Sequence, residues 1–283
     1  MKIIRSIASM QNRVKEMRKK AKRIGFVPTM GYLHPGHMSL AHQSVKECDI
    51  TVMSIYVNPL QFGSGEDYEK YPRDLKKDIT LSKKAGVDYL FVPSDYVMYP
   101  EGFSSKVSVT NVTQTLCGAS RPGHFEGVAT VVLKLFNIIM PDAAYFGQKD
   151  AQQAIIIKKM VKDLNMPIEI KALPIVREES GLAMSSRNAY LSEPQKLQAL
   201  SLYQALSKAR QLIRQGECSK VKIISAMKRL ILREKSVKID YIAIVDAEKL
   251  SIKKIIKGKV LIALAVFIGK VRLIDNIKLK VKK

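Results

Sequence analysis

Cysteine is scarce in this sequence, and its placement excludes two structural roles. Cys48, Cys117 and Cys218 are odd in number, lie far apart and show none of the close spacings that hold zinc. They form no disulfide framework of the kind found in small secreted domains, which fits a reducing cytoplasm. Residues 1–20 contain no apolar stretch of signal-peptide length, so we expect a cytoplasmic protein.

Long apolar runs are missing as well. The longest one, VLIALAVFI at residues 260–268, is too short to cross a bilayer and is typical of a buried strand. The composition is that of a globular protein, with 26% charged residues, and we therefore expect no membrane association.

Acidic residues are heavily outnumbered. The 25 Asp and Glu stand against 48 Lys and Arg and leave a net charge of +23, which attracts polyanions such as nucleic acid. The lysines are spread along the chain, however, and there is no RNP motif, zinc finger or aromatic-interleaved basic stripe. We therefore expect a solvated basic surface that suits small anionic substrates, and no nucleic-acid partner.

Strand-like and helix-like segments alternate up to residue 176, where a first domain is predicted to end. Apolar, β-branched runs predict strands at residues 23–29, 50–58, 88–92, 143–147 and 168–176. Amphipathic or apolar segments around them predict helices at residues 7–22, 36–48, 74–85, 124–140 and 148–165. Because parallel strands need crossover connections, this alternation predicts an α/β domain, residues 1–176, with a Rossmann-like parallel sheet.

The pattern changes in the remaining residues, 177–283. A polar loop leads to two predicted helices and then to three successive strands, at residues 193–215, 219–234, 238–246, 259–268 and 271–277. This order predicts a smaller α+β domain with a three-stranded antiparallel sheet. A chain of 283 residues is long enough for two such domains.

Histidine is also scarce, and three of the four histidines fall in FVPTMGYLHPGHMSLAHQ at residues 26–43. A strand, a glycine-containing turn and a helix start predict an anion site, because the first N–H groups of a helix have no partner within it. His34 and His37 lie about one helical turn apart and could both donate to phosphate oxygens. Zinc would need further ligands, and no HExxH motif or nearby cysteine supplies them. A phosphate site and a turn that merely contains two histidines both remain open.

A second motif resolves this choice through a resemblance. His-x-Gly-His after a strand is similar to the signature of adenylyl-transferring enzymes related to class I aminoacyl-tRNA synthetases, which pair it with a Met-Ser-Lys-Ser loop. MSSRN at 184–188 stands in that place, with Arg187 as the cation. Five segments resemble the pantoate–β-alanine ligase family in order and spacing, up to about residue 270: PTMGYLHPGH (28–37), VNPLQFG (57–63), RPGHFEGVATVV (121–132), FGQKDAQQ (146–153) and GLAMSSRNAYL (181–191).

The resemblance implies that (R)-pantoate and β-alanine are joined to pantothenate at the expense of ATP, through a pantoyl-adenylate, with release of AMP and pyrophosphate. It also implies Mg²⁺, which screens the phosphates, and a homodimer through the N-terminal domain. No dense carboxylate cluster marks a protein ligand for the metal, so that ligand is left unknown and Asp78 is not included in the site. The C-terminal domain is expected to close over the active site.

The resemblance also assigns residues. The expected catalytic residues are His34, His37, Lys149 and Arg187, with His37 as the family's proton donor, although a neutral imidazole could act by hydrogen bonding alone. Gln61, Gln153 and Asn58 are expected to bind pantoate, and Gln61 also β-alanine, because an amide can pair with a carboxylate and a hydroxyl. The expected ATP-binding residues are Met30, Gly31, Tyr32, Leu33, His34, Pro35, Gly36, His37, Gly147, Gln148, Lys149, Asp150, Val176, Met184, Ser185, Ser186 and Arg187.

Several positions are less settled. Arg121 is a further candidate near the substrates, whereas His124 is expected to be structural. Pro35 and Ser180 depart from the residues that many family members carry, and the tail after residue 270 shows nothing catalytic. The alternatives are a related nucleotidyltransferase with another acceptor, which would not need the Gln61 and Gln153 pair, and a basic RNA-binding protein.

Overall fold

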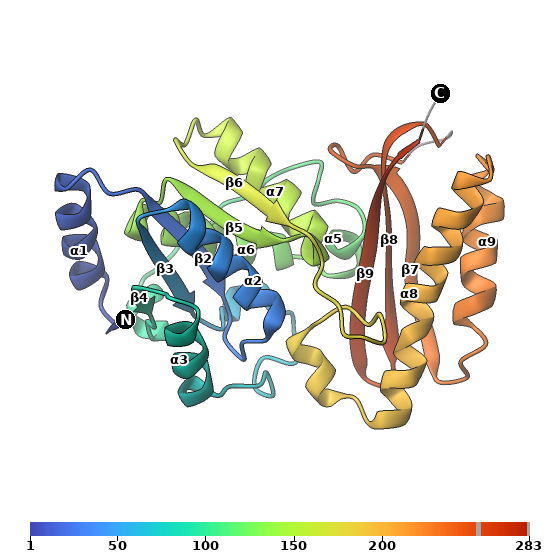
Figure 1. Cartoon of the computed structure of the whole chain (residues 1–283), viewed down its shortest axis with the longest axis horizontal. Coiled ribbons are helices and arrows are strands. Elements are labelled where there is room, and N and C mark those ends of the chain that lie inside the picture. The colour runs from blue at the N-terminus through green and yellow to red at the C-terminus, as the bar shows by residue number, and fades with distance from the viewer. Residues whose placement is uncertain (253–255, 282–283) are drawn as a thin grey trace. The chain divides into compact units, whose positions relative to one another are not determined.

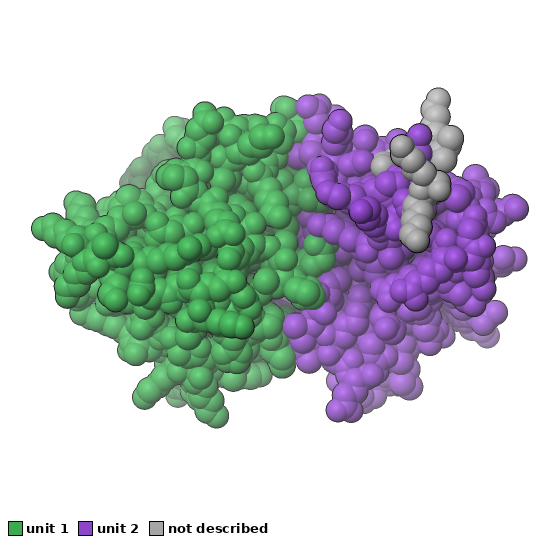
Figure 2. Space-filling model, turned by 45° about the horizontal axis from the view of Figure 1, so that its top comes forward, with its two compact units in different colours: residues 1–110, 121–148, 153–174 green, residues 111–120, 149–152, 175–283 purple. Residues whose placement is uncertain are grey.

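The computed structural model describes residues 1–252 and 256–281, which form two compact units (Figure 1; Figure 2). The first unit comprises residues 1–110, 121–148 and 153–174, and the second comprises residues 111–120, 149–152 and the chain from 175 onward. Two short excursions, 111–120 and 149–152, thus belong with the C-terminal unit. The single domain boundary that the sequence predicts, at residue 176, does not include them.

The first unit contains a six-stranded, all-parallel sheet in the order β1-β4-β3-β2-β5-β6. The five predicted strands are present, which confirms the Rossmann-like class, while β1 is too short to show a periodicity in the sequence. The strands are β1 (Lys2–Ile4), β2 (Ile24–Thr29), β3 (Ile50–Ile55), β4 (Tyr89–Phe91), β5 (Ala143–Gly147) and β6 (Glu169–Leu173). The helices are α1 (Ile7–Lys19), α2 (Pro35–Glu47), α3 (Leu75–Lys84), α4 (Asp95–Met98), α6 (His124–Ile139) and α7 (Ala151–Asp163).

The central strand β2 is buried on both faces. Val27 belongs to a cluster with Leu40 and Ala41 of α2, whereas the Phe26 ring lies 6.3 Å from that of Phe136 in α6. Burial on both faces explains why IGFVPT is a nearly continuous apolar run instead of an alternating one.

Pro28 stands inside this central strand without disrupting the sheet. Tyr56 N donates to Thr29 O on the β3 side, and successive residues of a strand alternate, so Pro28 faces β5. The pairing of β2 with β5 ends at Phe26, and the N–H that proline lacks is therefore not needed. The two strands separate toward their carboxyl ends.

The order of the sheet reverses around β2 and β5. The chain runs from β2 outward through β3 and β4, and later continues on the other side of β2 with β5 and β6. Open α/β sheets bind ligands at the carboxyl ends of the strands at such a point. The segments that follow β2, β3 and β5 are therefore the places to look for a site.

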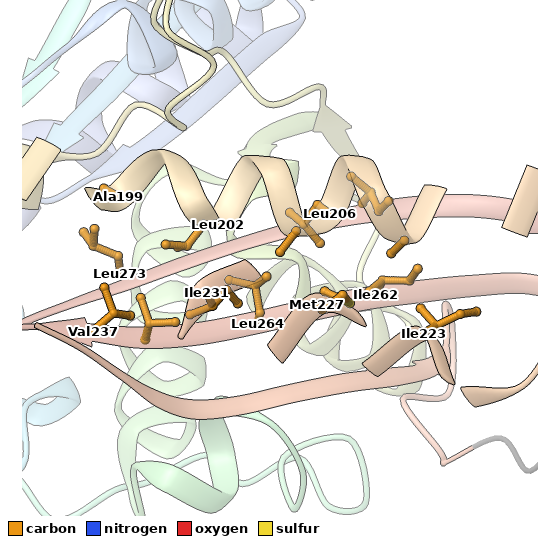
Figure 3. Close-up of a cluster of buried hydrophobic side chains, with 14 of the residues drawn as sticks. Ala199, Leu202, Leu206, Ile223, Met227, Ile231, Val237, Ile262, Leu264 and Leu273 are labelled. Carbon is orange, nitrogen blue, oxygen red and sulfur yellow. The ribbon is translucent and has the colours of Figure 1, made fainter. Parts of the chain in front are cut away.

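The second unit is a three-stranded antiparallel sheet covered by two long helices, as predicted. Apolar side chains of both helices and all three strands form its core (Figure 3). The elements are α5 (Cys117–Ser120), α8 (Glu193–Arg214), α9 (Lys220–Ile231), β7 (Val237–Asp246), β8 (Gly258–Ile268) and β9 (Val271–Val281). Across residues 1–252 and 256–281, no helix combines the length and apolar character that crossing a bilayer requires.

Candidate active site

The histidine loop, residues 30–37, connects β2 to α2 in the first unit. His34 is the N-cap of α2: Gly36 N donates to its Nδ1 at 3.2 Å, and His34 N donates to His37 Nδ1 at 3.3 Å. The two imidazoles thus form a capping box, and their ring centroids lie 4.0 Å apart. Pro35 occupies the first helical position, where a missing N–H costs nothing, so this departure from the family is compatible with the helix start.

These contacts define the hydrogen positions on the two rings. Because both Nδ1 atoms accept from backbone N–H groups, the neutral rings of His34 and His37 carry their hydrogen on Nε2. A doubly protonated ring would place a hydrogen on Nδ1 and lose its capping bond. The helix start therefore offers Nε2–H groups as hydrogen-bond donors, which suits an anion.

Asp78 of α3 holds the turn that precedes the histidines. Tyr32 N and Leu33 N donate to its two carboxylate oxygens over 2.9 and 2.7 Å, and Asp78 is only 1% exposed. Gly31 and Tyr32 both have a positive φ, 82° and 50°, a conformation that costs energy for tyrosine and needs support. Burial raises the pKa of the Asp78 carboxyl, and the two N–H donors only partly oppose that shift. The buried side chain of Leu33 adds an apolar anchor in the core beside α2.

The acceptor loop, residues 58–63, follows β3 and contains the 3-10 helix η1 (Pro59–Gln61). Gln61 is 8% exposed, and its Nε2 lies 2.8 Å from Met30 Sδ of the histidine loop. Asn58 is 1% exposed; its Nδ2 donates to Gln61 Oε1 and to Gly127 O, and its Oδ1 accepts from Tyr99 OH. The structure thus brings Met30, Asn58 and Gln61 together, and Asn58 supports the Gln61 amide.

Arg121 and His124 hold the backbone of the same loop. Gln61 O lies 2.7 Å from His124 Nδ1 and accepts from Arg121 NH2 at 3.2 Å. Arg121 forms a two-pronged ion pair with Glu66 and lies 2.9 Å from His124 Nε2 through NH1. Burial alone would raise the pKa of the Glu66 carboxyl, but the Arg121 guanidinium outweighs burial and holds that pKa below its usual value.

Gly127 explains another part of the RPGHFEGVATVV motif. It lies on α6 directly against η1, and a Cβ there would stand 2.1 Å from Leu60 O. A glycine is therefore needed for the acceptor loop to pack on α6. Arg121, His124 and Gly127 thus all act on the backbone of one loop.

The segment after β5 carries the remaining polar candidates. Gly147 and Gln148 belong to the first unit, whereas Lys149 and Asp150 belong to the second, with Lys149 Nζ 3.9 Å from Asp150 Oδ1. Gln153, on α7, is partly buried and belongs to the first unit.

Its neighbour Gln152 has a different environment. The Gln152 side chain accepts from Cys117 N and donates to Val112 O and Thr115 O, all within the second unit. Of the two adjacent glutamines, Gln152 is thus a structural residue.

The serine loop, residues 176–188, lies wholly in the second unit and folds back on itself. Met184 N donates to Val176 O at 3.0 Å, and Arg177 and Ala183 form an isolated antiparallel bridge. Gly181, with a φ of 93°, makes the reversal possible.

Two serines shape the ends of this reversal. Ser185 Oγ accepts from Arg187 N and begins the 3-10 helix η3 (Ser186–Tyr190). Ser180 Oγ accepts from Leu182 N, so the serine that departs from the family pattern accepts a hydrogen bond from the backbone of the turn.

The serine loop is stabilised by hydrogen bonds among its own residues and by one distant carboxylate, that of Asp275. The Arg177 guanidinium donates to both oxygens of Asp275, at 2.7 and 2.9 Å, and to Gly181 O. Asn188 Nδ2 donates to Glu178 Oε1 and to Ala183 O. Glu66 and Asp275 are not among the residues expected from the sequence, and Asp78 is left out of the expected site, because the partners of all three are backbone or distant side chains instead of neighbours in a motif.

Comparisons with known proteins show which family the chain belongs to. The family model described as pantoate-beta-alanine ligase matches residues 2–278. The chain belongs to the pantoate-beta-alanine ligase family. It is therefore an enzyme, a ligase of pantothenate biosynthesis.

Relatives and solved structures place it firmly within this family. It is 57% identical to the pantothenate synthetase of Caldicellulosiruptor bescii, with all of both chains covered. The crystal structure of the Thermus thermophilus pantothenate synthetase matches with a TM-score of 0.94 and 43% identity, over the whole of both chains. A Francisella tularensis pantoate-beta-alanine ligase, solved in complex with βγ-ATP and β-alanine, matches with a TM-score of 0.78 and 37% identity, over 98% of this chain and 97% of the other.

Proposed function

We propose that this ligase forms pantothenate in two steps at one nucleotide site. The carboxylate of (R)-pantoate attacks the α-phosphate of ATP, releasing pyrophosphate and forming pantoyl-adenylate; the amine of β-alanine then attacks the acyl carbon and releases AMP. Neither step needs a protein nucleophile, so catalysis rests on positioning and on stabilising charge. The observation that carries the proposal is the donor-rich histidine loop with the buried Gln61 amide against Met30, in a chain of this family.

The two histidines are proposed to act as neutral hydrogen-bond donors. Their Nδ1 atoms are used by the capping box, so each Nε2–H can donate to an α-phosphate oxygen as negative charge develops. Proton donation by His37 would require the imidazolium and would break the bond from His34 N. The capping geometry therefore favours hydrogen bonding over proton transfer, the alternative that sequence alone left open.

The other site residues keep the roles that the resemblance implies, as proposals. Gln61 and Gln153 bind pantoate, with Gln61 also meeting β-alanine, and Asn58 contributes through Gln61. In the second unit, Lys149 and Arg187 supply positive charge for the phosphates. The Val176 backbone, Asp150 and the remaining ATP-binding residues complete the nucleotide contacts.

Mg²⁺ is proposed to arrive with ATP. In the described part of the chain, no three or more His, Cys, Asp or Glu side chains gather into a group that could hold a metal ion. Mg²⁺ often binds through phosphate oxygens and water, so the proposal needs no dedicated set of protein ligands. A homodimer and a cytoplasmic location complete the proposal and rest on the family resemblance and on the scattered, unpaired cysteines.

The deciding experiment measures AMP formation with each substrate omitted in turn. We expect AMP only when ATP, pantoate and β-alanine are all present, and pyrophosphate–ATP exchange with pantoate alone. AMP formed equally well without pantoate would contradict the proposal and favour a related nucleotidyltransferase with another acceptor. The RNA-binding alternative would be favoured if the wild-type protein forms no AMP and a variant without His34 and His37 still binds RNA.

A further inference from the structure

Two adjacent polar residues, Asp275 and Asn276, interrupt the apolar strand β9, VRLIDNIKLKV. Both are 3% exposed. Asp and Asn are depleted in strands, and a buried pair of them is a local conflict with the fold that needs a compensating gain. The question is what these two side chains hold.

The two side chains project from opposite faces of the sheet. Asp275 pairs with Leu264 of β8, which belongs to the core between the sheet and the helices α8 and α9 (Figure 3). Asn276 pairs with Ala263, which points to the other face. Adjacent residues of β9 can therefore form hydrogen bonds to two different chain segments, one on each face of the sheet.

Asp275 fixes the base of the serine loop. Its carboxylate receives two hydrogen bonds from Arg177, whose guanidinium also donates to Gly181 O and lies 4.6 Å from the Tyr203 ring centroid on α8. Asn276 N donates to Asp275 Oδ1 at 2.7 Å and holds the carboxylate in place. A bidentate arginine–carboxylate pair sets orientation as well as distance. The residues next to Arg177 include Val176, proposed above for the nucleotide.

Asn276 fixes the other nucleotide segment of the second unit. Its Nδ2 donates to Lys149 O at 2.8 Å, across 127 residues of sequence. Lys149 is the cation proposed for the phosphates, and its position depends on where its backbone is held. The same two strand residues thus anchor Lys149 and the serine loop, which lie far apart in the sequence.

We infer that Asp275 and Asn276 are positioning residues for adenylate formation, acting through Arg177 and Lys149 and touching no substrate. The inference rests on the proposed function, because Lys149 and the serine loop must meet ATP for their placement to matter. It also predicts which half of the reaction responds. Attack of pantoate on ATP needs both segments in place, whereas reaction of a preformed adenylate with β-alanine uses the acceptor side.

The test compares Asn276→Ala, Asn276→Asp and Asp275→Asn with the wild-type enzyme. Asn276→Asp keeps the shape of the side chain but presents no N–H to Lys149 O. Asp240→Asn is the control, because Asp240 of β7 also accepts two hydrogen bonds from an arginine, Arg272, in the same sheet, both through Oδ2, but contacts no proposed nucleotide segment. Pyrophosphate–ATP exchange measures the first half-reaction, and single turnover of enzyme-bound adenylate with β-alanine measures the second.

Both Asn276 variants should lower kcat/KM for ATP in the exchange assay by about tenfold, the order expected when one buried hydrogen bond is lost. The second half-reaction should change less than about twofold, and the control variant should keep the wild-type exchange rate. Unchanged exchange in both Asn276 variants, an equal loss in both half-reactions, or an equal loss in Asp240→Asn would overturn the inference. If Asn276→Ala does not fold, Asn276→Asp, which keeps the shape of the side chain and presents no N–H to Lys149 O, provides the comparison.

The wild-type assay separates this inference from the proposed function. If wild-type enzyme forms no AMP with all three substrates, the proposed function fails. If it does form AMP and the variants match it, only the positioning role fails.

Discussion

The histidine loop and the serine loop are stabilised in different ways. The histidine loop has its capping box among its own residues, since His34 and His37 bond to backbone atoms at most three positions away, and it needs one buried carboxylate from α3. The serine loop depends on Asp275, 98 residues further along the chain, which binds Arg177. The contacts of the histidine loop therefore lie within a short sequence motif, whereas the main anchor of the serine loop forms only when the whole second unit is folded.

The largest expected effect is at the histidine loop. His37→Ala should lower adenylate formation by about 10² to 10³, the loss typical of one transition-state donor. Pyrophosphate release measures the rate, and circular dichroism checks that the variant is folded. His42→Ala is the control, because His42 is exposed on the same helix. A full-rate His37→Ala enzyme would remove His37 from the mechanism.

Asp78→Asn tests a long-range support of that loop, the buried carboxylate that accepts from Tyr32 N and Leu33 N. The amide presents one oxygen and one N–H where two backbone donors now meet two oxygens, so one buried donor loses its acceptor. We expect the free energy of unfolding to fall by about 1–3 kcal/mol, with a reduced rate of adenylate formation. Urea denaturation measures the stability.

Asp74→Asn, at the N-cap of the same helix, keeps its bond from Lys77 N and should be nearly neutral. Equal stability of the two variants would mean that Asp78 does not hold the turn.

Gly181→Ala tests the serine loop. A Cβ at this position would lie 2.5 Å from the Tyr203 ring. The alanine would also have to adopt the backbone φ of 93° that glycine has here. Gly216 has nearly the same φ, 92°, but no atom within 4 Å of a Cβ, so Gly216→Ala isolates the backbone cost. We expect Gly216→Ala to cost about 1 kcal/mol and Gly181→Ala up to about 3 kcal/mol, measured by urea denaturation. Identical costs would show that the ring moves aside freely.

Glu66→Gln has the smallest expected effect and tests the support of the acceptor loop by its pH dependence. The pKa of Glu66 in the fold is below its usual value of 4.5, so its ion pair with Arg121 stabilises the folded state above that pH. This contribution is lost as the pH falls through the lowered pKa. The stability gap between wild type and Glu66→Gln should be about 1 kcal/mol at pH 7 and should shrink below about pH 4.5. A gap that stays constant from pH 7 to 3 would contradict an ionised pair.

Much of the fold could be predicted from the sequence because its signals are local. The apolar runs of β2, β3 and β5, and the alternation with α2, α6 and α7, reflect burial of one element against the next. The histidine motif could be predicted for the same reason, since a strand, a turn and a helix cap occupy consecutive residues. Short β1 escaped prediction because three residues contain no period.

The α/β class, the family and the segments proposed to carry the chemistry are all legible in the order of the residues. How those segments are held is visible only in the folded chain: Asp78 accepts from the turn at Tyr32, and His124 lies against Gln61 O. Asp275 and Asn276 hold their segments from a tail in which the sequence shows nothing catalytic. The physical reason is that the role of a buried polar side chain depends on the group to which it hydrogen-bonds. These partners are backbone atoms and distant residues that the linear order does not bring together.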